Sequence, residues 1–342
     1  MSAGNELSPK DRRTIACALE RMGLGANGET FEASPLSGGV SCDVWHIRLA
    51  NGCELVIKRA LPKLRVDADW RAPAGRSAAE ADWFRLVAEV DPRLVPEVVA
   101  EDRAHHMFAM EYLPIDSHPI WKTVLAAGRA EANFAGQVGA ALSRIHAYTA
   151  GREDIARDFA HAVLFRALRL EPYLLFTASK HPDLAPRIRA TAERIAQSRI
   201  ALMQGDISPK NILVGADGPV FLDAETASFG DPAFDLAFCL NHLLLKGAWH
   251  PEFRPLYRES FARLAQTYLE GVRWEAAGDL EERASELLPM LLLARIDGES
   301  PVEYLTQDTD KAFVRAAART LLLQGPTSLA QIADYFAGAS SR

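Results

Sequence analysis

Residues 204–237, QGDISPKNILVGADGPVFLDAETASFGDPAFDLA, hold the pattern that decides the fold of this chain. Asp206 lies five residues before Asn211, and a second aspartate, Asp223, follows two short apolar runs. The runs Ile-Leu-Val and Val-Phe-Leu flank a Gly-Ala-Asp-Gly turn, whose Asp-Gly pair favours a hairpin between two strands. Such a hairpin places Asn211 and Asp223 at adjacent strand ends, with Asp206 in the loop just before them.

These three side chains have the chemistry of a site for a hard cation. An amide oxygen and a carboxylate, with positions left for phosphate and water, suit Mg²⁺ bound to a nucleotide better than zinc or copper. Taken singly, Asp206, Asn211 or Asp223 would each be interpreted as a cap or turn residue. Together, in this order and with a hairpin between them, they predict a metal site with a base beside it.

The order of these residues resembles the catalytic and metal-binding loops of the protein-kinase-like superfamily. Gly205 before the first aspartate and the sequence Gly-Asp-Pro-Ala-Phe-Asp-Leu-Ala at 230–237 resemble the branch that contains aminoglycoside phosphotransferases and choline kinases. This resemblance implies an α+β, bilobal fold. The small N-terminal lobe has a five-stranded antiparallel sheet and one helix, and the larger C-terminal lobe is mostly helical.

The resemblance also implies where the lobes meet. A nucleotide-binding lobe is expected over residues 1–113, a hinge at about 111–116, and a helical lobe with the catalytic loop and acceptor site over 114–342. A chain of 342 residues is long enough for two lobes. The strands of the first lobe are expected in 35–49, which holds two strands around a glycine pair, and in 54–59, 94–100 and 107–113.

A short glycine-containing loop precedes the predicted strand that ends in a lysine. Ser37, Gly38 and Gly39 would by themselves be interpreted as a hairpin turn. Because the loop lies about twenty residues before Lys58, the resemblance implies that its backbone amides approach nucleotide phosphates, which larger side chains would prevent.

Lys58 itself matches the strand lysine that reaches the α- and β-phosphates in the family. Its implied partner is Glu80, at the start of an amphipathic helix, and Glu89 is the alternative. The connection over residues 61–76 is either a flap or an exposed linker. At the hinge, Glu111 and Leu113 are expected to bind the adenine edge through main-chain atoms, with ATP or GTP as the nucleotide.

The resemblance assigns further roles around the catalytic loop. Asp206 would accept or orient the proton of the substrate hydroxyl, and Asn211 with Asp223 would hold Mg²⁺. Asp235 would brace the loop by accepting its backbone amides. Gln204 stands where family members usually have histidine, although glutamine also donates and accepts hydrogen bonds.

Four more residues are candidates for contact with substrate, each with a plainer alternative. Lys210 either binds the γ-phosphate or faces water, and Glu225 either reaches a second metal through water or is a solvated turn acid. Arg295 and Asp297, at the end of a long apolar helix, either wall the acceptor site or form a local ion pair.

Composition excludes several other classes of function. A net charge of -7 and a pI near 5.8, without a basic run, disfavour binding to nucleic acid. Neither a secretory signal nor an apolar run of membrane-spanning length is present, and four cysteines without metal-like spacing are expected to be buried free thiols in the cytoplasm. Acidic groups lining the helical lobe would favour a cationic substrate, but the diffuse net charge does not locate them. No feature indicates an oligomeric state.

The predicted function is therefore an ATP-dependent phosphotransferase that moves the γ-phosphate to a hydroxyl of a small molecule. The alternative is a catalytically silent, nucleotide-binding scaffold protein. Two features favour this alternative: Gln204 in place of histidine, and a phosphate loop with few glycines. A protein kinase is disfavoured, because the Gly-Asp-Pro motif follows Asp223 without room for an activation segment.

Overall fold

The computed structural model describes residues 7–25, 30–36, 41–61, 75–325 and 327–338. The chain divides into two compact units, the first comprising Met1–Pro114 with Asp223–Glu225 and the second comprising Ile115–Leu222 with Thr226–Arg342. The predicted phosphate loop, Ser37, Gly38 and Gly39, lies outside the described residues, as does most of the predicted 61–76 connection.

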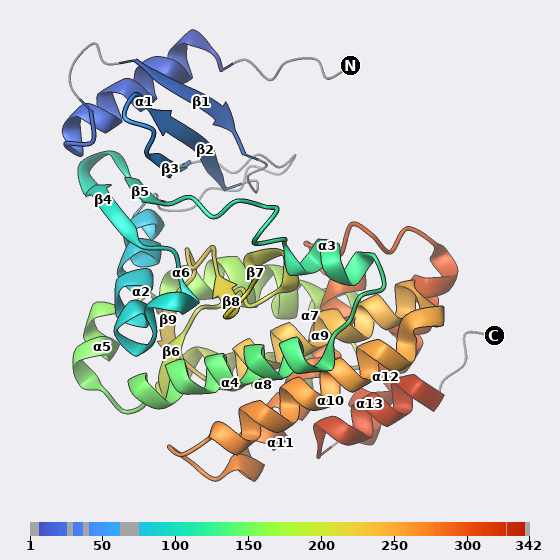
Figure 1. Ribbon diagram of the computed structural model, residues 1–342. Helices are drawn as coiled ribbons and strands as arrows, with labels where there is room; N and C mark the ends of the chain where they lie inside the picture. The colour runs from blue at the N-terminus through green and yellow to red at the C-terminus, as the bar shows by residue number, and fades with distance from the viewer. Residues whose placement is uncertain (1–6, 26–29, 37–40, 62–74, 326, 339–342) are drawn as a thin grey trace. The chain divides into compact units, whose positions relative to one another are not determined.

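The first unit is built on a five-stranded antiparallel sheet in the order β1-β2-β3-β5-β4, as predicted (Figure 1). The strands are β1 (Phe31–Pro35), β2 (Cys42–Leu49), β3 (Glu54–Ala60), β4 (Val98–Asp102) and β5 (Met107–Glu111). Strand β3 lies in the middle of this order, so both of its edges are hydrogen-bonded to neighbouring strands, β2 and β5.

Two helices pack against the sheet of this unit. Helix α1 (Pro9–Arg21) begins at Ser8, whose hydroxyl accepts the amide of Asp11, and its buried Ile15 and Leu19 pack on one face of the sheet. Helix α2 (Arg76–Val90) packs against β3, β4 and β5. Since side chains alternate along a strand, Leu55 and Ile57 of β3 join the α1 core, whereas Lys58 points to the other face.

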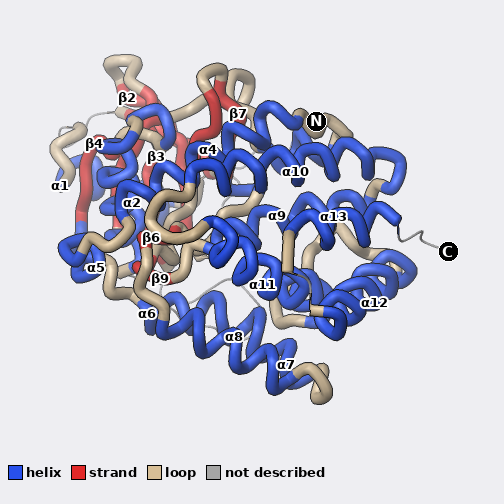
Figure 2. Tube along the Cα trace, turned by 90° about the horizontal axis from the view of Figure 1, so that it is seen from below, coloured by secondary structure: helices blue, strands red, loops and turns tan. Residues whose placement is uncertain are grey.

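The second unit is mostly helical, and its centre is α9 (Ala233–Trp249). Every residue of α9 except Trp249 is buried, as expected for a helix that is apolar on all sides, and it packs against both α10 and α11 (Figure 2). The other helices are α3 (Trp121–Ala126), α4 (Ala132–Thr149), α5 (Glu153–Asp158), α6 (Ala162–Phe165), α7 (Phe176–Lys180), α8 (Ala185–Gln197), α10 (Arg254–Gly271), α11 (Ala277–Asp297), α12 (Asp308–Gln324) and α13 (Leu329–Gly338).

Two small sheets carry the loop with Asp206. The predicted hairpin is present as β7 (Ile212–Gly215) and β8 (Gly218–Phe221), with Gly215 opposite Gly218. The second sheet pairs β6 (Ala201–Met203) with β9 (Ser228–Gly230). The chain from β6 to β9 is therefore tied at both ends, which fixes the loop between them.

Several predicted boundaries were wrong. Strand β1 ends at Pro35, where the prediction began, and β4 starts at Val98 because Pro92–Leu94 forms a 3₁₀ turn capped by Asp91. Helix α8 ends at Gln197, and the apolar residues 201–203 that follow form β6. Pairing between β6 and β9 is long-range, so no local pattern distinguishes this strand from the end of a helix.

All four cysteines are free, but the expectation that they are buried holds only for Cys42 and Cys239. Cys17 is exposed because α1 turns Ile15 and Ala18 toward the core and Cys17 away from it. Cys53 is exposed in the turn between β2 and β3. Within the described ranges, the structure contains no helix of sufficient length and apolar character to span a bilayer.

Candidate functional site

Asp206 lies buried in the loop after β6, and its two carboxylate oxygens have different surroundings. Three nitrogen groups surround Oδ2: Asn211 Nδ2 at 3.0 Å, Lys210 Nζ at 3.0 Å and Arg169 Nη2 at 3.1 Å. No side chain of the described residues donates a hydrogen bond to Oδ1. One oxygen is therefore held in place by cations and an amide, and the other is left to accept a proton.

The backbone of this loop is held by Asp235, as the resemblance implied. Asp235 Oδ2 accepts the amide of Gln204 at 2.7 Å, and Oδ1 accepts the amide of Gly205 at 2.9 Å. His146 lies behind, with Nε2 3.4 Å from Asp235 Oδ2 and Nδ1 2.8 Å from the Tyr268 hydroxyl. His146 is fully buried and belongs to this supporting network.

Gln204 binds the loop through both ends of its side chain. Its Nε2 donates to the carbonyl oxygen of Leu222 at 2.7 Å, and its Oε1 accepts the amide of Asp206 at 2.6 Å. Gly205 has a φ of 82°, and a Cβ there would lie 2.8 Å from the Thr226 hydroxyl. The loop therefore needs glycine before the aspartate and is compatible with glutamine before the glycine.

Arg169 is a functional candidate that sequence reasoning missed. It lies in a π-helical segment, Arg166–Leu175, which connects α6 to α7 and contains Pro172. Its Nε donates to the carbonyl oxygen of Gly205 at 2.6 Å, while Nη2 is 3.1 Å from Asp206 Oδ2. Arg169 therefore positions both the loop backbone and the aspartate, and π-helical turns are frequent at functional sites.

In the first unit, the predicted pair of Lys58 with Glu80 is present. Lys58 Nζ lies 2.7 Å from Glu80 Oε2 and also 2.5 Å from Asp223 Oδ1. Burial lowers the pKa of Lys58, but the carboxylates of Asp223 and Glu80 outweigh burial and hold that pKa well above its usual value. A charged lysine is thus fixed between two acidic side chains, and burial raises the pKa of the Glu80 carboxyl to about 7. Of the two candidate partners, Glu80 is thus the glutamate that pairs with Lys58.

Asp223 has an unusual backbone conformation, and Glu225 has a partner of its own. The φ of Asp223 is 62°, in the left-handed region that aspartate tolerates better than most residues. Glu225 Oε2 accepts a hydrogen bond from Arg76 Nε at 2.9 Å, and both side chains are buried. The predicted solvated-turn alternative therefore does not describe Glu225, and a role toward a second metal stays a prediction.

The two residues of the predicted hinge differ in how their backbone is used. Glu111 ends β5, and its amide donates to the carbonyl oxygen of Glu97 at 2.9 Å. Leu113 follows outside the strand, and no backbone hydrogen bond between described residues uses its amide or carbonyl. Main-chain groups of Leu113 are thus left for another partner, and binding of adenine there stays a prediction.

A cavity of about 190 Å³ in the second unit contains Asp206 on its wall. Arg295 and Lys210, both predicted substrate residues, also line it, whereas Asp297 does not. Asp297 instead accepts hydrogen bonds from Arg315 at 2.6 and 2.8 Å, the local ion pair that was the alternative for that residue. The remaining lining residues are Lys122, Tyr173, Ser208, Pro209, Phe238, His242, Ser300, Pro301, Glu303 and Tyr304.

The part of the wall that α9 forms shows a pattern in the sequence from which a polar cavity could have been predicted. Phe238 and His242 are one turn apart on α9, and Lys246 follows by another turn. A histidine and a lysine at helical spacing in a wholly buried apolar helix are unusual, because burial of such groups is unfavourable without partners. The pattern could have placed α9 beside a polar cavity.

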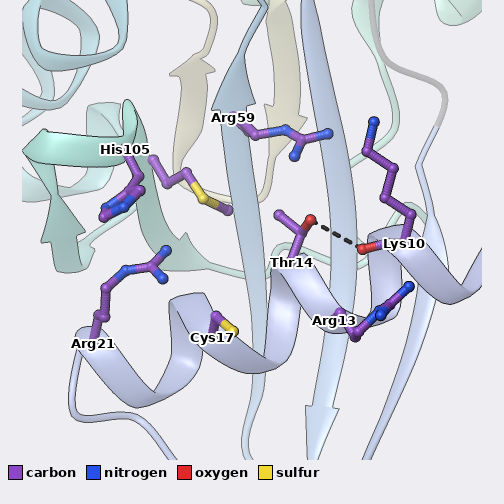
Figure 3. Close-up of a pocket in the computed structure, with 8 residues that line it drawn as sticks. Lys10, Arg13, Thr14, Cys17, Arg21, Arg59 and His105 are labelled. Atoms are coloured by element: carbon purple, nitrogen blue, oxygen red, sulfur yellow. Dashed lines mark hydrogen bonds between the residues drawn. The ribbon is translucent and has the colours of Figure 1, made fainter.

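A second pocket, of about 460 Å³, lies in the first unit between α1 and the sheet (Figure 3). Its basic side chains are largely occupied by acids: Arg21 and His105 bind Asp102, and Arg59 binds Asp43. Thr14 Oγ1 donates to the carbonyl oxygen of Lys10, within the same helix (Figure 3). None of the predicted site residues that the structure describes lines this pocket.

Comparison with known proteins agrees with this geometry. The family model of the APH phosphotransferase enzyme family matches residues 32–277, which is well over half of the chain. Methylthioribose kinase from Geobacillus kaustophilus is 24% identical over 276 residues, covering 72% of this chain and 68% of that protein. Methylthioribose kinase 2 from Oryza sativa subsp. japonica is 25% identical over 228 residues, covering 58% of this chain and 53% of that protein. This chain thus spans about half to two thirds of these two relatives.

The fold also matches solved structures. Amicoumacin kinase hAmiN, in complex with AMP-PNP, Ca²⁺ and Ami, superposes with a TM-score of 0.58 at 12% identity, covering 95% of this chain and 97% of that one. At this identity the likeness bears on the fold, and it confirms the predicted kinase-like architecture of sheet and helices. The family match confirms the predicted enzyme class as well. The chain belongs to the APH phosphotransferase enzyme family.

Proposed function

We propose that the protein transfers the γ-phosphate of ATP to a hydroxyl group of a small molecule held in the cavity beside Asp206. The observation that carries this proposal is the asymmetry of the Asp206 carboxylate, with Oδ2 bound by three nitrogen groups and Oδ1 free of hydrogen bonds from described residues. A base with one fixed and one free oxygen, on the wall of a cavity, is suited to receive a hydroxyl proton.

Phosphoryl transfer asks the protein mainly for positioning and neutralisation of charge. Asp206 orients the attacking hydroxyl through Oδ1 and takes up its proton as the oxygen bonds to the γ-phosphorus. The bond between that phosphorus and the β,γ-bridging oxygen breaks, and ADP leaves. Arg169 and Lys210 hold Oδ2, so the carboxylate does not rotate when the hydroxyl binds. Ser208 adds a buried hydroxyl on the same wall, without a hydrogen-bond partner among the described residues.

The donor set fits a magnesium ion. Asn211 uses Nδ2 for Asp206, so its oxygen Oδ1 remains, and no described residue donates a hydrogen bond to it. Asp223 supplies a carboxylate whose side chain is one quarter exposed. Amide and carboxylate oxygens are ligands that Mg²⁺ prefers, and we assign Asn211 and Asp223 to hold it. When bound, Mg²⁺ neutralises charge on the phosphate oxygens.

The remaining roles concern the nucleotide. Lys58, held as an ammonium by Glu80, is assigned to the α- and β-phosphates, and main-chain atoms of Glu111 and Leu113 to the adenine edge. The loop at Ser37, Gly38 and Gly39 is assigned to the phosphates on the family pattern. Membership of the phosphotransferase family and similarity to methylthioribose kinases support ATP and a small hydroxylated acceptor.

Magnesium-dependent ADP release tests the proposal across hydroxylated acceptors, including aminoglycosides, amino alcohols, sugars and methylthioribose. Asp206→Asn should lower turnover at least about 100-fold while ATP affinity stays within about threefold, because the base is lost and the nucleotide contacts are kept. Asp217→Asn, an exposed change in the hairpin turn, is the matched control. Undiminished turnover in Asp206→Asn would refute the role of this base. MgATP binding without ADP release from any acceptor would favour the alternative of a silent nucleotide-binding protein.

A further inference from the structure

The charged side chains around the acceptor cavity do not balance. Five charged residues line it, and two pairs form among them. Lys122 Nζ donates to Glu303, and Lys210 Nζ lies 3.0 Å from Asp206 Oδ2. Both acids are thereby matched, and Arg295 is the cation that remains. Arg169 adds a second positive group on Asp206 from behind.

Arg295 is buried without a carboxylate partner. Its exposed fraction is 8%, and its Nη1 donates to Ser300, to both the carbonyl oxygen and the hydroxyl, and to the Tyr173 hydroxyl at 3.3 Å. Those acceptors are neutral, and Nε and Nη2 find no acceptor among the described residues. A buried guanidinium usually pairs with an anion, because burial without one is strongly unfavourable. Its fork of donors matches carboxylate and phosphate geometry.

The neighbourhood is positive beyond Arg295. Lys246 has no acceptor for Nζ among the described residues, and its ammonium lies 3.9 Å from the ring centre of Tyr304, a lining residue. His242, also on the wall, is kept neutral: burial and then the positive charges of Arg295, Lys210, Lys246 and Lys122 hold its pKa well below the usual value. The cavity thus combines several cations with a histidine that adds no further charge.

We infer that the acceptor carries an anionic group as well as its hydroxyl, and that Arg295 binds this anion while Asp206 orients the hydroxyl. The inference rests on the proposed function of the same cavity. Carboxylate and phosphate share the required charge and geometry, and both remain open. The cavity is smaller than the roughly 300 Å³ at which ligand pockets usually begin. A compact hydroxy acid or sugar phosphate therefore fits the site better than a polycationic aminoglycoside. This charge is opposite to that of the cationic substrate that acidic lining groups would have favoured.

Calorimetric titration of matched compounds tests this inference on the full chain with Mg²⁺ and a non-hydrolysable ATP analogue. The carboxylate arm compares gluconate with gluconamide and shikimate with its methyl ester. The phosphate arm compares glucose 6-phosphate with glucose and glycerol 3-phosphate with glycerol, and methylthioribose serves as a neutral compound. In at least one arm the anion should bind about tenfold or more tightly than its neutral twin. The arm that responds identifies the anion.

Arg295→Gln should reduce that preference to about threefold or less, whereas Arg295→Lys should keep part of it. Arg315→Gln, which removes the partner of Asp297 outside the cavity, should leave the preference unchanged and serves as the matched control. If Arg295→Gln does not fold, the wild-type preference and its loss on raising salt from about 0.05 to 0.5 M decide the question.

Equal binding of twins in both arms, absence of binding by every anion, or a preference that survives Arg295→Gln would each overturn the inference. Phosphoryl transfer is followed separately as ADP release. An anion preference without ADP release would leave the anion-binding role of Arg295 standing and contradict the proposed function. ADP release from neutral acceptors without any anion preference would support the proposed function and overturn the inference.

Discussion

The side-chain amide of Asn211 donates to two oxygens of Asp206, the carbonyl oxygen and Oδ2, each at 3.0 Å. Both residues are buried. Because Nδ2 is committed in this way, the amide has one orientation, and its oxygen is directed to other partners. The proposed base and the proposed metal ligand therefore depend on each other, so that a change to one residue alters the position of the other.

Asn211→Asp tests whether the hydrogen bond from Asn211 to Asp206 matters in addition to the metal ligand that Asn211 provides. The new carboxylate keeps an oxygen for the metal but faces the carboxylate of Asp206 without a hydrogen to donate. We expect turnover to fall at least about 100-fold and the free energy of unfolding to drop by about 1–3 kcal/mol. Urea denaturation and ADP release measure the two effects. Asn51→Asp, in an exposed turn, is the control, and turnover within threefold of wild type would contradict the prediction.

Asp223→Ala should abolish magnesium-dependent binding of ATP. The change removes the carboxylate assigned to the metal and also one of the two acids that hold Lys58, 2.5 Å away. Calorimetry with and without Mg²⁺ measures the effect, and Asp82→Ala, a change at a partly exposed position on α2 of the same unit, is the control. ATP binding that still responds to Mg²⁺ as in wild type would argue against the metal role.

Replacement of Gln204 tests how much this residue stabilises the loop at the position where family members usually have histidine. Gln204→Leu leaves the Leu222 carbonyl and the Asp206 amide unpaired, so we expect the free energy of unfolding to fall by about 2–4 kcal/mol. Gln204→His should lower the free energy of unfolding by less, because a neutral imidazole has one hydrogen-bond donor and one acceptor. Urea midpoints report both, with Gln197→Leu as an exposed control. Equal losses for the leucine and histidine variants would be the contrary result.

Arg169→Met should lower turnover about 10- to 100-fold with little change in KM for ATP. The substitution removes a cation from Asp206 Oδ2 and a donor from the Gly205 carbonyl, so the base is misplaced while nucleotide contacts stay. Arg169→Lys should recover only part, because one ammonium does not serve both acceptors at their observed positions. Arg166→Met, a half-exposed change in the same helical segment, is the control. A rise in KM at constant turnover would assign Arg169 to ATP binding instead.

Lys246 gives a prediction for stability against pH. Burial, and then Lys122, lower the pKa of Lys246 from 10.5 to about 8 in the folded protein. Between about pH 8 and 10.5 the unfolded chain therefore holds a proton that the folded chain has lost, and the contribution of Lys246 to the free energy of unfolding rises with pH. Below pH 8 this contribution is unfavourable. Contact with the Tyr304 ring and solvent screening offset part of it.

Lys246→Met should accordingly stabilise the protein at pH 7 by about 1–2 kcal/mol, with an advantage that shrinks as pH rises toward 10. The difference in free energy of unfolding between variant and wild type, measured in urea at each pH, cancels other titrating groups. Lys180→Met, at the exposed end of α7, should show no such trend. A difference that is independent of pH would contradict the prediction.

The elements that sequence predicted correctly are those that local pattern and an ordered motif determine. The hairpin of β7 and β8, the support of the loop amides by Asp235 and the pairing of Lys58 with Glu80 all follow from spacing and the family resemblance. Each involves residue types whose chemistry fixes the partner. The five-stranded sheet was predicted for the same reason, although β1 and β4 begin or end several residues from the predicted bounds.

What sequence did not predict depends on contacts between distant segments. Arg169 reaches Asp206 across 37 positions because a π-helical segment carries it there, and an arginine in an amphipathic helix is ordinarily solvated. The surplus charge at Arg295 became visible only when its neighbours were known to be neutral or already paired. Local periodicity contains no information on either arrangement, because both are set by how helices pack.

The inclusion of Asp223–Glu225 in the first unit has a consequence for synthesis on the ribosome. The segment Met1–Pro114, which holds Lys58, is made first, but Asp223, one of the two acids beside Lys58, emerges only about 110 residues after Pro114. At roughly 5–20 residues per second, the nascent first unit waits about 6–22 seconds for that carboxylate. During this interval its buried ammonium has Glu80 alone, and Arg76 lacks Glu225. The unit that is translated first is thus completed late, and a chain released before residue 225 would lack these acids.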